Sequence, residues 1–99
     1  MADQPVTVFA RHKAKAGREE ELKRIFLDMV GETRKEEGCI NYNLHQANDD
    51  PAEFRFYENW TSRKHLDDHL AAPHLKRFFE IADDILAEPP EIKILTKLA

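Results

Sequence analysis

Four short segments alternate between apolar and polar positions, which is the pattern of half-buried β-strands. They are residues 5–13 (PVTVFARHK), 39–46 (CINYNLHQ), 53–60 (EFRFYENW) and 91–98 (EIKILTKL). In the first segment Val6, Val8 and Ala10 fall on one side. Turn-forming residues fill 47–53 (ANDDPAE), so the second and third strands are predicted to form a hairpin.

Two other stretches carry apolar residues at intervals of three and four, the period of an amphipathic helix. The first follows Gly17, with apolar residues at Leu22, Ile25, Phe26, Met29 and Val30 and with Thr33 next at the same helical spacing. We expect it to end at Gly38, because glycine readily takes the left-handed conformation of a helix cap. The second begins near Ser62, a good N-cap, and restarts at Pro73. Its later apolar stripe is Leu75, Phe78, Phe79, Ala82, Ile85 and Leu86.

The resulting order is strand, helix, strand, strand, helix, strand, which predicts a ferredoxin-like βαββαβ fold of the α+β class. We expect residues 1–99 to form one domain, with a four-stranded antiparallel sheet and the helices on one face. Two helices cover only one face of such a sheet. The other face still carries Phe9, Tyr57 and Leu95. We therefore predict that two sheets pack together in a homodimer.

Composition narrows the partners and the compartment. Fifteen basic and nineteen acidic residues give a net charge of −4, and the two signs are interleaved, so we expect no nucleic-acid partner. The start MADQPVTVF lacks the features of a signal peptide, and no apolar run approaches the roughly 18 residues of a membrane span. Cys39 is the single cysteine and has no disulfide partner, which suits a reducing compartment. We expect a cytoplasmic protein without a membrane partner.

Three of the five histidines, His65, His69 and His74, fall within ten positions. His65 and His69 lie four apart, a spacing by which a helix supplies two metal ligands. However, Leu66 stands where the zinc-protease motif has a glutamate, and no third ligand follows from spacing, so we expect no metal. His74 lies in the first turn of its helical segment, where the helix dipole favours the neutral imidazole that a proton acceptor needs. Spacing alone favours structural or surface histidines.

Aromatic residues form a second candidate site. Phe54, Phe56 and Trp60 are predicted to face the helices, and with Tyr42 they could wall an apolar pocket. The alternative is that Trp60 is simply part of the core. The chain holds only three glycines and no phosphate-cradling loop, nucleophile elbow or dinucleotide fingerprint, so we expect no bound cofactor.

Three motifs resemble the antibiotic biosynthesis monooxygenase domain, especially its bacterial quinol monooxygenase branch. They are KEEGCINY (35–42), ENW (58–60) and HLDDHLAAPHLKRFFE (65–80). The long pattern HLxxHLxxPHxK is matched at His65, His69, Pro73 and His74, and ExW is matched at Glu58 and Trp60. The resemblance covers essentially the whole chain and implies a ferredoxin-like subunit that pairs into a dimeric α/β barrel.

The resemblance also implies an activity. It implies that the protein oxygenates electron-rich aromatics such as quinols or anthrones with dioxygen, without flavin, haem or metal. By this resemblance His69 or His74 is the base, and Tyr42 or His65 holds a quinol oxygen. The full set of catalytic candidates is His65, His69 and His74. The substrate-binding candidates are Tyr42, Phe54, Phe56, Glu58 and Trp60.

Two other functions stay open at this point. One relative in the same family isomerises a small phosphorylated signalling metabolite, and a non-enzymatic small-molecule-binding module is a further alternative. A phosphorylated substrate calls for a converging lysine or arginine, whereas the aromatic residues favour a flat aromatic ligand. Arg63, Lys64 and Lys76 lie near the histidines, so the sequence leaves the choice open.

Overall fold

The computed structural model describes residues 4–99 of the chain. Residues 1–3 lie outside the described residues. They begin the stretch MADQPVTVF, in which the sequence predicts no signal peptide. The elements follow in the order β1 (Val6–Lys13), α1 (Glu19–Thr33), β2 (Cys39–Ala47), β3 (Asp50–Trp60), α2 (Arg63–Leu70), α3 (Pro73–Ile85) and β4 (Glu91–Leu95). This order confirms the predicted ferredoxin-like α+β fold.

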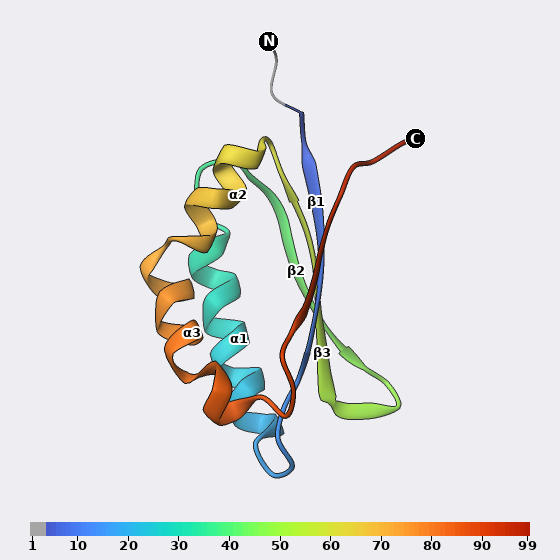
Figure 1. Cartoon of the computed structure of the whole chain (residues 1–99), viewed down its shortest axis with the longest axis vertical. Coiled ribbons are helices and arrows are strands. Elements are labelled where there is room, and N and C mark those ends of the chain that lie inside the picture. Colours follow the sequence, from blue (N-terminus) through green and yellow to red (C-terminus); the bar gives the residue numbers. More distant parts are fainter. Residues whose placement is uncertain (1–3) are drawn as a thin grey trace.

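The four strands form one antiparallel sheet in the order β2-β3-β1-β4, and the three helices cover one of its faces (Figure 1). Register places Ala10 of β1 opposite Phe56 of β3 and Ile92 of β4. Residues opposite each other share a face, so these three side chains point toward the helices. Within residues 4–99, no helix has the length and apolar character needed to cross a membrane.

The helix α1 ends earlier than the sequence predicts, at Thr33 rather than at Gly38. Tight turns replace the expected last turn, with the N–H of Glu36 donating to the carbonyl of Thr33 (2.9 Å). Gly38 does adopt a positive φ of 84°, but in the turn that enters β2. A Cβ at this position would overlap the ring of His65, so the chain needs glycine there for close packing as well as for conformation.

The strands also differ from the prediction in detail. Strict alternation along β2 would place Ile40 on the inner face with Tyr42, but Ile40 is exposed, because a register shift between Cys39 and Asn41 breaks the alternation. The third strand begins at Asp50, so the hairpin connection is shorter than 47–53. The last strand, β4, ends before residue 98.

Aromatic rings fill the space between the helices and the sheet. Phe26 of α1 is fully buried, with ring centroids 4.9, 5.1 and 5.8 Å from those of Phe56, Phe78 and Phe54. Burying such rings supplies most of the driving force for packing the two layers. Phe79, which belongs to the predicted apolar stripe of α3, is instead about half exposed.

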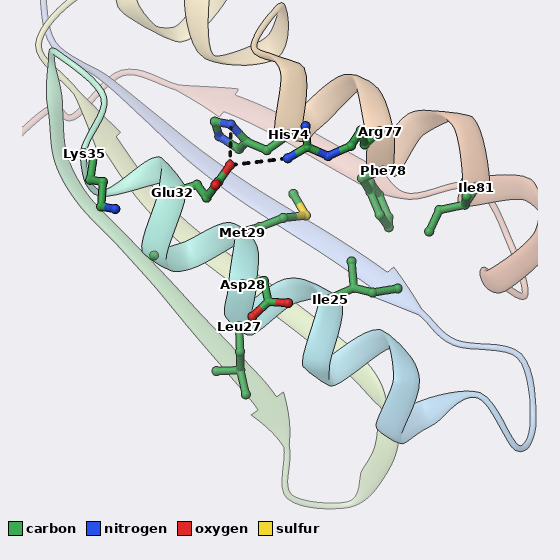
Figure 2. Close-up of a pocket in the computed structure, with 11 residues that line it drawn as sticks. Ile25, Leu27, Asp28, Met29, Glu32, Lys35, His74, Arg77, Phe78 and Ile81 are labelled. Carbon is green, nitrogen blue, oxygen red and sulfur yellow. Dashed lines mark hydrogen bonds and ion pairs between the residues drawn. The ribbon is translucent and has the colours of Figure 1, made fainter.

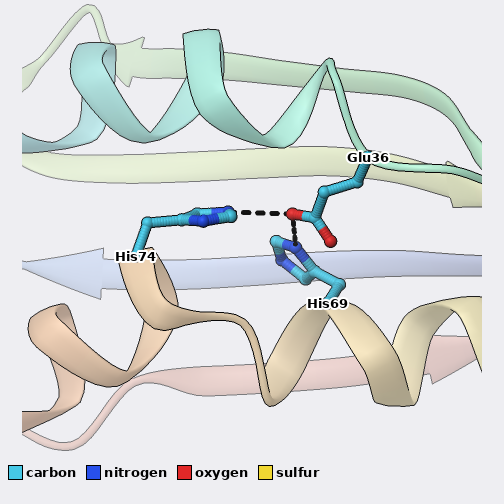
Figure 3. A group of neighbouring side chains, drawn as sticks. All are labelled: Glu36, His69 and His74. Atoms are coloured by element: carbon cyan, nitrogen blue, oxygen red, sulfur yellow. Dashed lines mark hydrogen bonds and ion pairs between the residues drawn. The ribbon is translucent and has the colours of Figure 1, made fainter.

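The break between α2 and α3 follows local signals in the sequence. The side chain of Ser62 caps α2 by accepting from the N–H of His65 (3.2 Å), and Pro73 occupies the first turn of α3. The two short helices turn His69, near the end of α2, and His74, at the start of α3, toward the end of α1 (Figure 3).

Candidate functional site

A small cavity of about 40 Å³ lies between the sheet and the helices. Its wall is mostly apolar and is drawn from all seven elements. Four lining residues can titrate: His12, Tyr42, Glu58 and His69. Phe79, Ile92 and Ile94 also line the cavity and are each more than 40% exposed, so they mark its opening.

Beside this cavity, one carboxylate oxygen joins two histidines (Figure 3). Oε2 of Glu36 lies 2.8 Å from Nδ1 of His69 and 2.8 Å from Nε2 of His74. We call these three residues the Glu36 cluster. A carboxylate can only accept, so each histidine donates an N–H to it. In the neutral form of His69 the proton therefore sits on Nδ1, and the lone pair is left on Nε2.

Trp60 contacts two polar residues of the site, His69 and Glu58, from the side away from the cavity. Its ring is fully buried and lies 4.6 Å from the ring of His69, and its N–H donates to Oε1 of Glu58 (3.0 Å). Trp60 and Phe54 do not line the cavity, whereas Tyr42, Phe56 and Glu58 do. Three of the five predicted substrate-binding residues therefore face the cavity.

Burial sets the electrostatics of the cavity wall. It raises the pKa of Glu58 to about 7, with a further rise from the charge of Glu36 and a partial offset from the bond to Trp60. Burial lowers the pKa of His69, although the hydrogen bond to Glu36 opposes this. Burial alone lowers the pKa of His12 to about 4. At neutral pH the cavity therefore presents neutral imidazoles.

The other two predicted catalytic histidines lie outside the cavity. His65 is held by the hydroxyls of Ser62 and Thr61, 2.8 and 2.9 Å from its Nδ1, and it is separate from the Glu36 cluster. His74 lines a groove of about 660 Å³ between α1 and α3, where its Nδ1 lies 3.5 Å from Glu32 (Figure 2). His74 thus touches the cluster on one side and the groove on the other.

Sequence reasoning missed two residues of the site. Glu36 lies in a turn, within a charged run that carries no periodic signal. His12 continues the alternation of Val8 and Ala10 onto the helix side, and this signal could have identified it. Among the described residues, Nδ1 of His12 is the one fully buried side-chain nitrogen or oxygen without a hydrogen-bond partner.

None of the described lysines or arginines lines the cavity. Arg63 and Lys64, which lie close to the histidines in sequence, form exposed ion pairs with Asp67 and Asp68 (3.0 and 2.9 Å). The converging basic residue that a phosphorylated substrate calls for is therefore not found at this cavity.

The chain is similar to known proteins over nearly its full length. Residues 5–81 match the family model described as antibiotic biosynthesis monooxygenase. The chain is 30% identical over 94 residues to "Putative monooxygenase Rv0793" of Mycobacterium tuberculosis, covering 95% of this chain and 92% of that protein. It is 36% identical over 93 residues to "Uncharacterized protein sll1783" of Synechocystis, covering 94% of this chain but only 63% of the length of that relative.

Solved structures are also similar to this chain over nearly its full length. The structure of PA3566 from Pseudomonas aeruginosa superimposes with a TM-score of 0.92 at 31% identity, covering 100% of this chain and 99% of that one. The structure of Rv0793 superimposes with a TM-score of 0.91 at 29% identity, covering 97% of both chains.

Proposed function

The chain belongs to the antibiotic biosynthesis monooxygenase family, and on that premise we propose that it is a cofactor-independent monooxygenase. Its proposed substrate is an electron-rich aromatic compound, such as a quinol or an anthrone, which reacts with dioxygen. One observation carries this proposal: His69, oriented by Glu36, forms part of the wall of an apolar cavity.

We assign the role of general base to His69. Glu36 holds the proton of the neutral imidazole on Nδ1, which leaves the lone pair of Nε2 to accept a proton from a hydroxyl in the cavity. The same carboxylate stabilises the imidazolium that forms, as the acid does in other acid–histidine pairs. His74 contacts the same carboxylate and helps to position it. We do not assign His74 the role of base, because it lines the groove rather than the cavity.

Deprotonation makes the aromatic ring a better electron donor, so it can pass an electron to dioxygen directly. The resulting radical pair combines to a ring peroxide, and loss of water leaves the oxygenated product. For a hydroquinone, one molecule of substrate and one of dioxygen give one hydroxyquinone and one water. The proton taken by His69 returns to the departing oxygen, so the residue is ready for another turnover.

The cavity wall supports an apolar, flat substrate over a phosphorylated one. A phosphate would face the carboxyl of Glu58 without a lysine or arginine to balance its charge. A volume of about 40 Å³ admits only a few water-sized molecules, so an aromatic ring requires the opening at Phe79, Ile92 and Ile94 to move apart. These exposed apolar side chains also suit the entry of an apolar ring.

We also propose that two copies pack through the uncovered faces of their sheets. Phe9 and Tyr57 lie on that face with ring centroids 5.4 Å apart, and both are about half exposed. Charged residues, among them Arg11 and Glu53, surround them. An apolar centre with a polar rim is the composition expected of a protein interface. Light scattering on the full chain tests this, and the mass of one chain would contradict it.

The catalytic proposal is tested by oxygen consumption of chelator-treated protein with a panel of hydroquinones and anthrones. His69→Gln is expected to lower kcat by about 10²- to 10⁴-fold, the usual contribution of a general base. Glu36→Gln should lower it as well, because the amide cannot stabilise the imidazolium. Glu37→Gln is the matched control, since Glu37 is the next residue and its side chain is almost fully exposed.

Full activity of His69→Gln, or an equal loss in His65→Ala, would overturn the assignment of the base. If the wild-type protein consumes no oxygen with any member of the panel but converts a phosphorylated sugar, the isomerase alternative holds. If it only binds aromatic compounds without turnover, it is a binding module.

A further inference from the structure

We propose that the Glu36 cluster also binds one divalent transition-metal ion, with Zn²⁺ the best match, and that the bound ion switches off the base. Helical spacing pairs His65 with His69 and supplies no third ligand, whereas the structure leaves His65 apart and brings His74 beside His69. The structure supplies the third, Glu36, from a turn that is 33 positions from His69 and 38 from His74. The metal binding is independent of the proposed function, whereas the loss of activity rests on it.

The geometry is close to that of a coordination site. One ligand atom from each residue of the Glu36 cluster lies within 4.8 Å of the other two. Two of these separations, carboxylate oxygen to imidazole nitrogen, are 2.8 Å. Metal bonds of about 2.0–2.1 Å at tetrahedral angles place ligand atoms roughly 3.3 Å apart. Small side-chain movements would therefore bring all three atoms around one ion.

The donor set selects the kind of ion. Two imidazole nitrogens and one carboxylate oxygen are the ligands of many zinc sites, in which a water completes the tetrahedron. Hard cations such as Mg²⁺ prefer oxygen ligands only. The same set also suits Co²⁺, which binds more weakly than Zn²⁺ in a given site of this type.

Surrounding residues resemble the support that metal ligands receive. A histidine that binds a metal usually donates its other N–H to a carboxylate. Nδ1 of His74 faces Oε2 of Glu32 at 3.5 Å, on the side away from the cluster (Figure 2). The ring of His69 packs against both Trp60 and Tyr42, with centroids 4.6 and 5.3 Å away, and only 2% of its side chain is exposed. This packing fixes the orientation of the His69 ring, as the surroundings of a metal ligand usually do.

Through His74 the cluster also borders the groove, on the side away from the cavity opening. His74 lines the groove between α1 and α3 together with Glu32, Lys35 and Arg77 (Figure 2). The side chain of Glu32 is about half exposed in this groove, where its Oε2 lies 3.5 Å from both Arg77 and His74, so we infer that a hydrated cation approaches the cluster from this side by exchanging with Arg77.

Metal binding and proton acceptance exclude each other at His69. A metal on Nδ1 uses the lone pair of that nitrogen, so the proton of the neutral imidazole moves to Nε2. Nε2 is the atom to which we assign proton acceptance from the substrate, and as an N–H it can no longer accept. The ion therefore inhibits turnover without occupying the cavity.

The test uses the full chain after chelator treatment and removal of the chelator. Titration calorimetry with Zn²⁺ alone is expected to show one site, and Mg²⁺ none. Co²⁺ should give visible absorption bands of a tetrahedral site. Glu36→Gln and His74→Ala should each weaken Zn²⁺ binding at least 100-fold, and Glu32→Gln about tenfold. Glu37→Gln and His45→Ala, an adjacent acid and a histidine outside the cluster, should bind Zn²⁺ like the wild type.

The proposal fails if the wild type binds no Zn²⁺, or if Glu36→Gln and His74→Ala bind it unchanged while circular dichroism shows that they are folded. Oxygen consumption separates this result from the proposed function. Stoichiometric Zn²⁺ should abolish turnover, and a chelator should restore it. Full turnover by zinc-loaded protein would overturn the switch. Absence of turnover in metal-free protein would instead overturn the oxygenase proposal and leave zinc binding to be judged by calorimetry.

Discussion

The two faces of the sheet shift the pKa of a glutamate in opposite directions. Glu58 and Glu53 lie on β3 an odd number of positions apart, so their side chains point to opposite faces. On the helix-covered face, burial raises the pKa of Glu58 to about 7. On the uncovered face, the hydrogen bond from Arg55 (2.7 Å) is the main cause of a lowered pKa of Glu53.

This contrast shows where the molecule can carry out proton chemistry. On the uncovered face acids pair with arginines, as Glu53 does with Arg11 and Arg55, and this pairing favours the ionised carboxylate. Under the helices, imidazoles and a carboxyl are held in the neutral or nearly neutral state by an apolar surrounding. The helices therefore shape the chemistry of the site, because the burial that they provide shifts the pKa values of Glu58, His69 and His12.

The largest difference between the faces should appear on removing aromatic rings from adjacent positions. Phe56→Ala leaves a cavity under the helices and should lower the free energy of unfolding by about 3–5 kcal/mol. Tyr57→Ala, one position later on the uncovered face, should lower it by less than about 1 kcal/mol and weaken the proposed dimer instead. Urea unfolding and light scattering measure the two effects. Equal losses of stability would contradict this contrast.

A smaller difference should appear in the pH dependence of stability. The pKa of Glu58 is higher in the folded chain than in the unfolded chain. The free energy of unfolding therefore falls as pH rises from about 4.5 through 7, because the folded chain resists ionisation of this carboxyl. The shift corresponds to about 3 kcal/mol, and Glu58→Gln should remove this loss while keeping an acceptor for Trp60. The lowered pKa of Glu53 has the opposite sign, so Glu53→Gln should remove stability that is lost on acidification.

Urea unfolding of the wild type and both variants between pH 4 and pH 8 measures these slopes. The comparison fails if the two variants change the slope in the same direction, or if Glu58→Gln leaves the slope at neutral pH unchanged.

The smallest effect concerns the two strand histidines. His12→Leu should raise the free energy of unfolding at pH 7 by about 1 kcal/mol, because it removes a buried nitrogen without a partner at nearly constant volume. It should also remove the loss of stability that the wild type shows as pH falls from 6.5 through about 4. His45→Leu, outside the cavity, is the control. A loss of stability in His12→Leu would show that the imidazole has a structural role.

Much of the fold follows from local patterns. Alternation and helical periodicity predict the four strands, the helices and their order, and Ser62 and Pro73 mark where α2 and α3 begin. The errors occur where the backbone departs from a regular period. The register shift at Ile40 turns that side chain outward, and tight turns end α1 before Gly38.

The sequence by itself determined which side chains face the helices along the regular parts of the strands and helices, because the strand and helix periods are properties of local backbone geometry. It did not determine this for Ile40, where the register shifts, or for Phe79, which is about half exposed. It also placed His69 and His74 close together along the chain. Only the tertiary structure decided that Glu36 meets both histidines, that Trp60 supports His69 from behind, and that His65 stays apart. These contacts join segments far apart in the sequence, and the pKa values depend on burial, which is a property of the packed layers and not of any single segment.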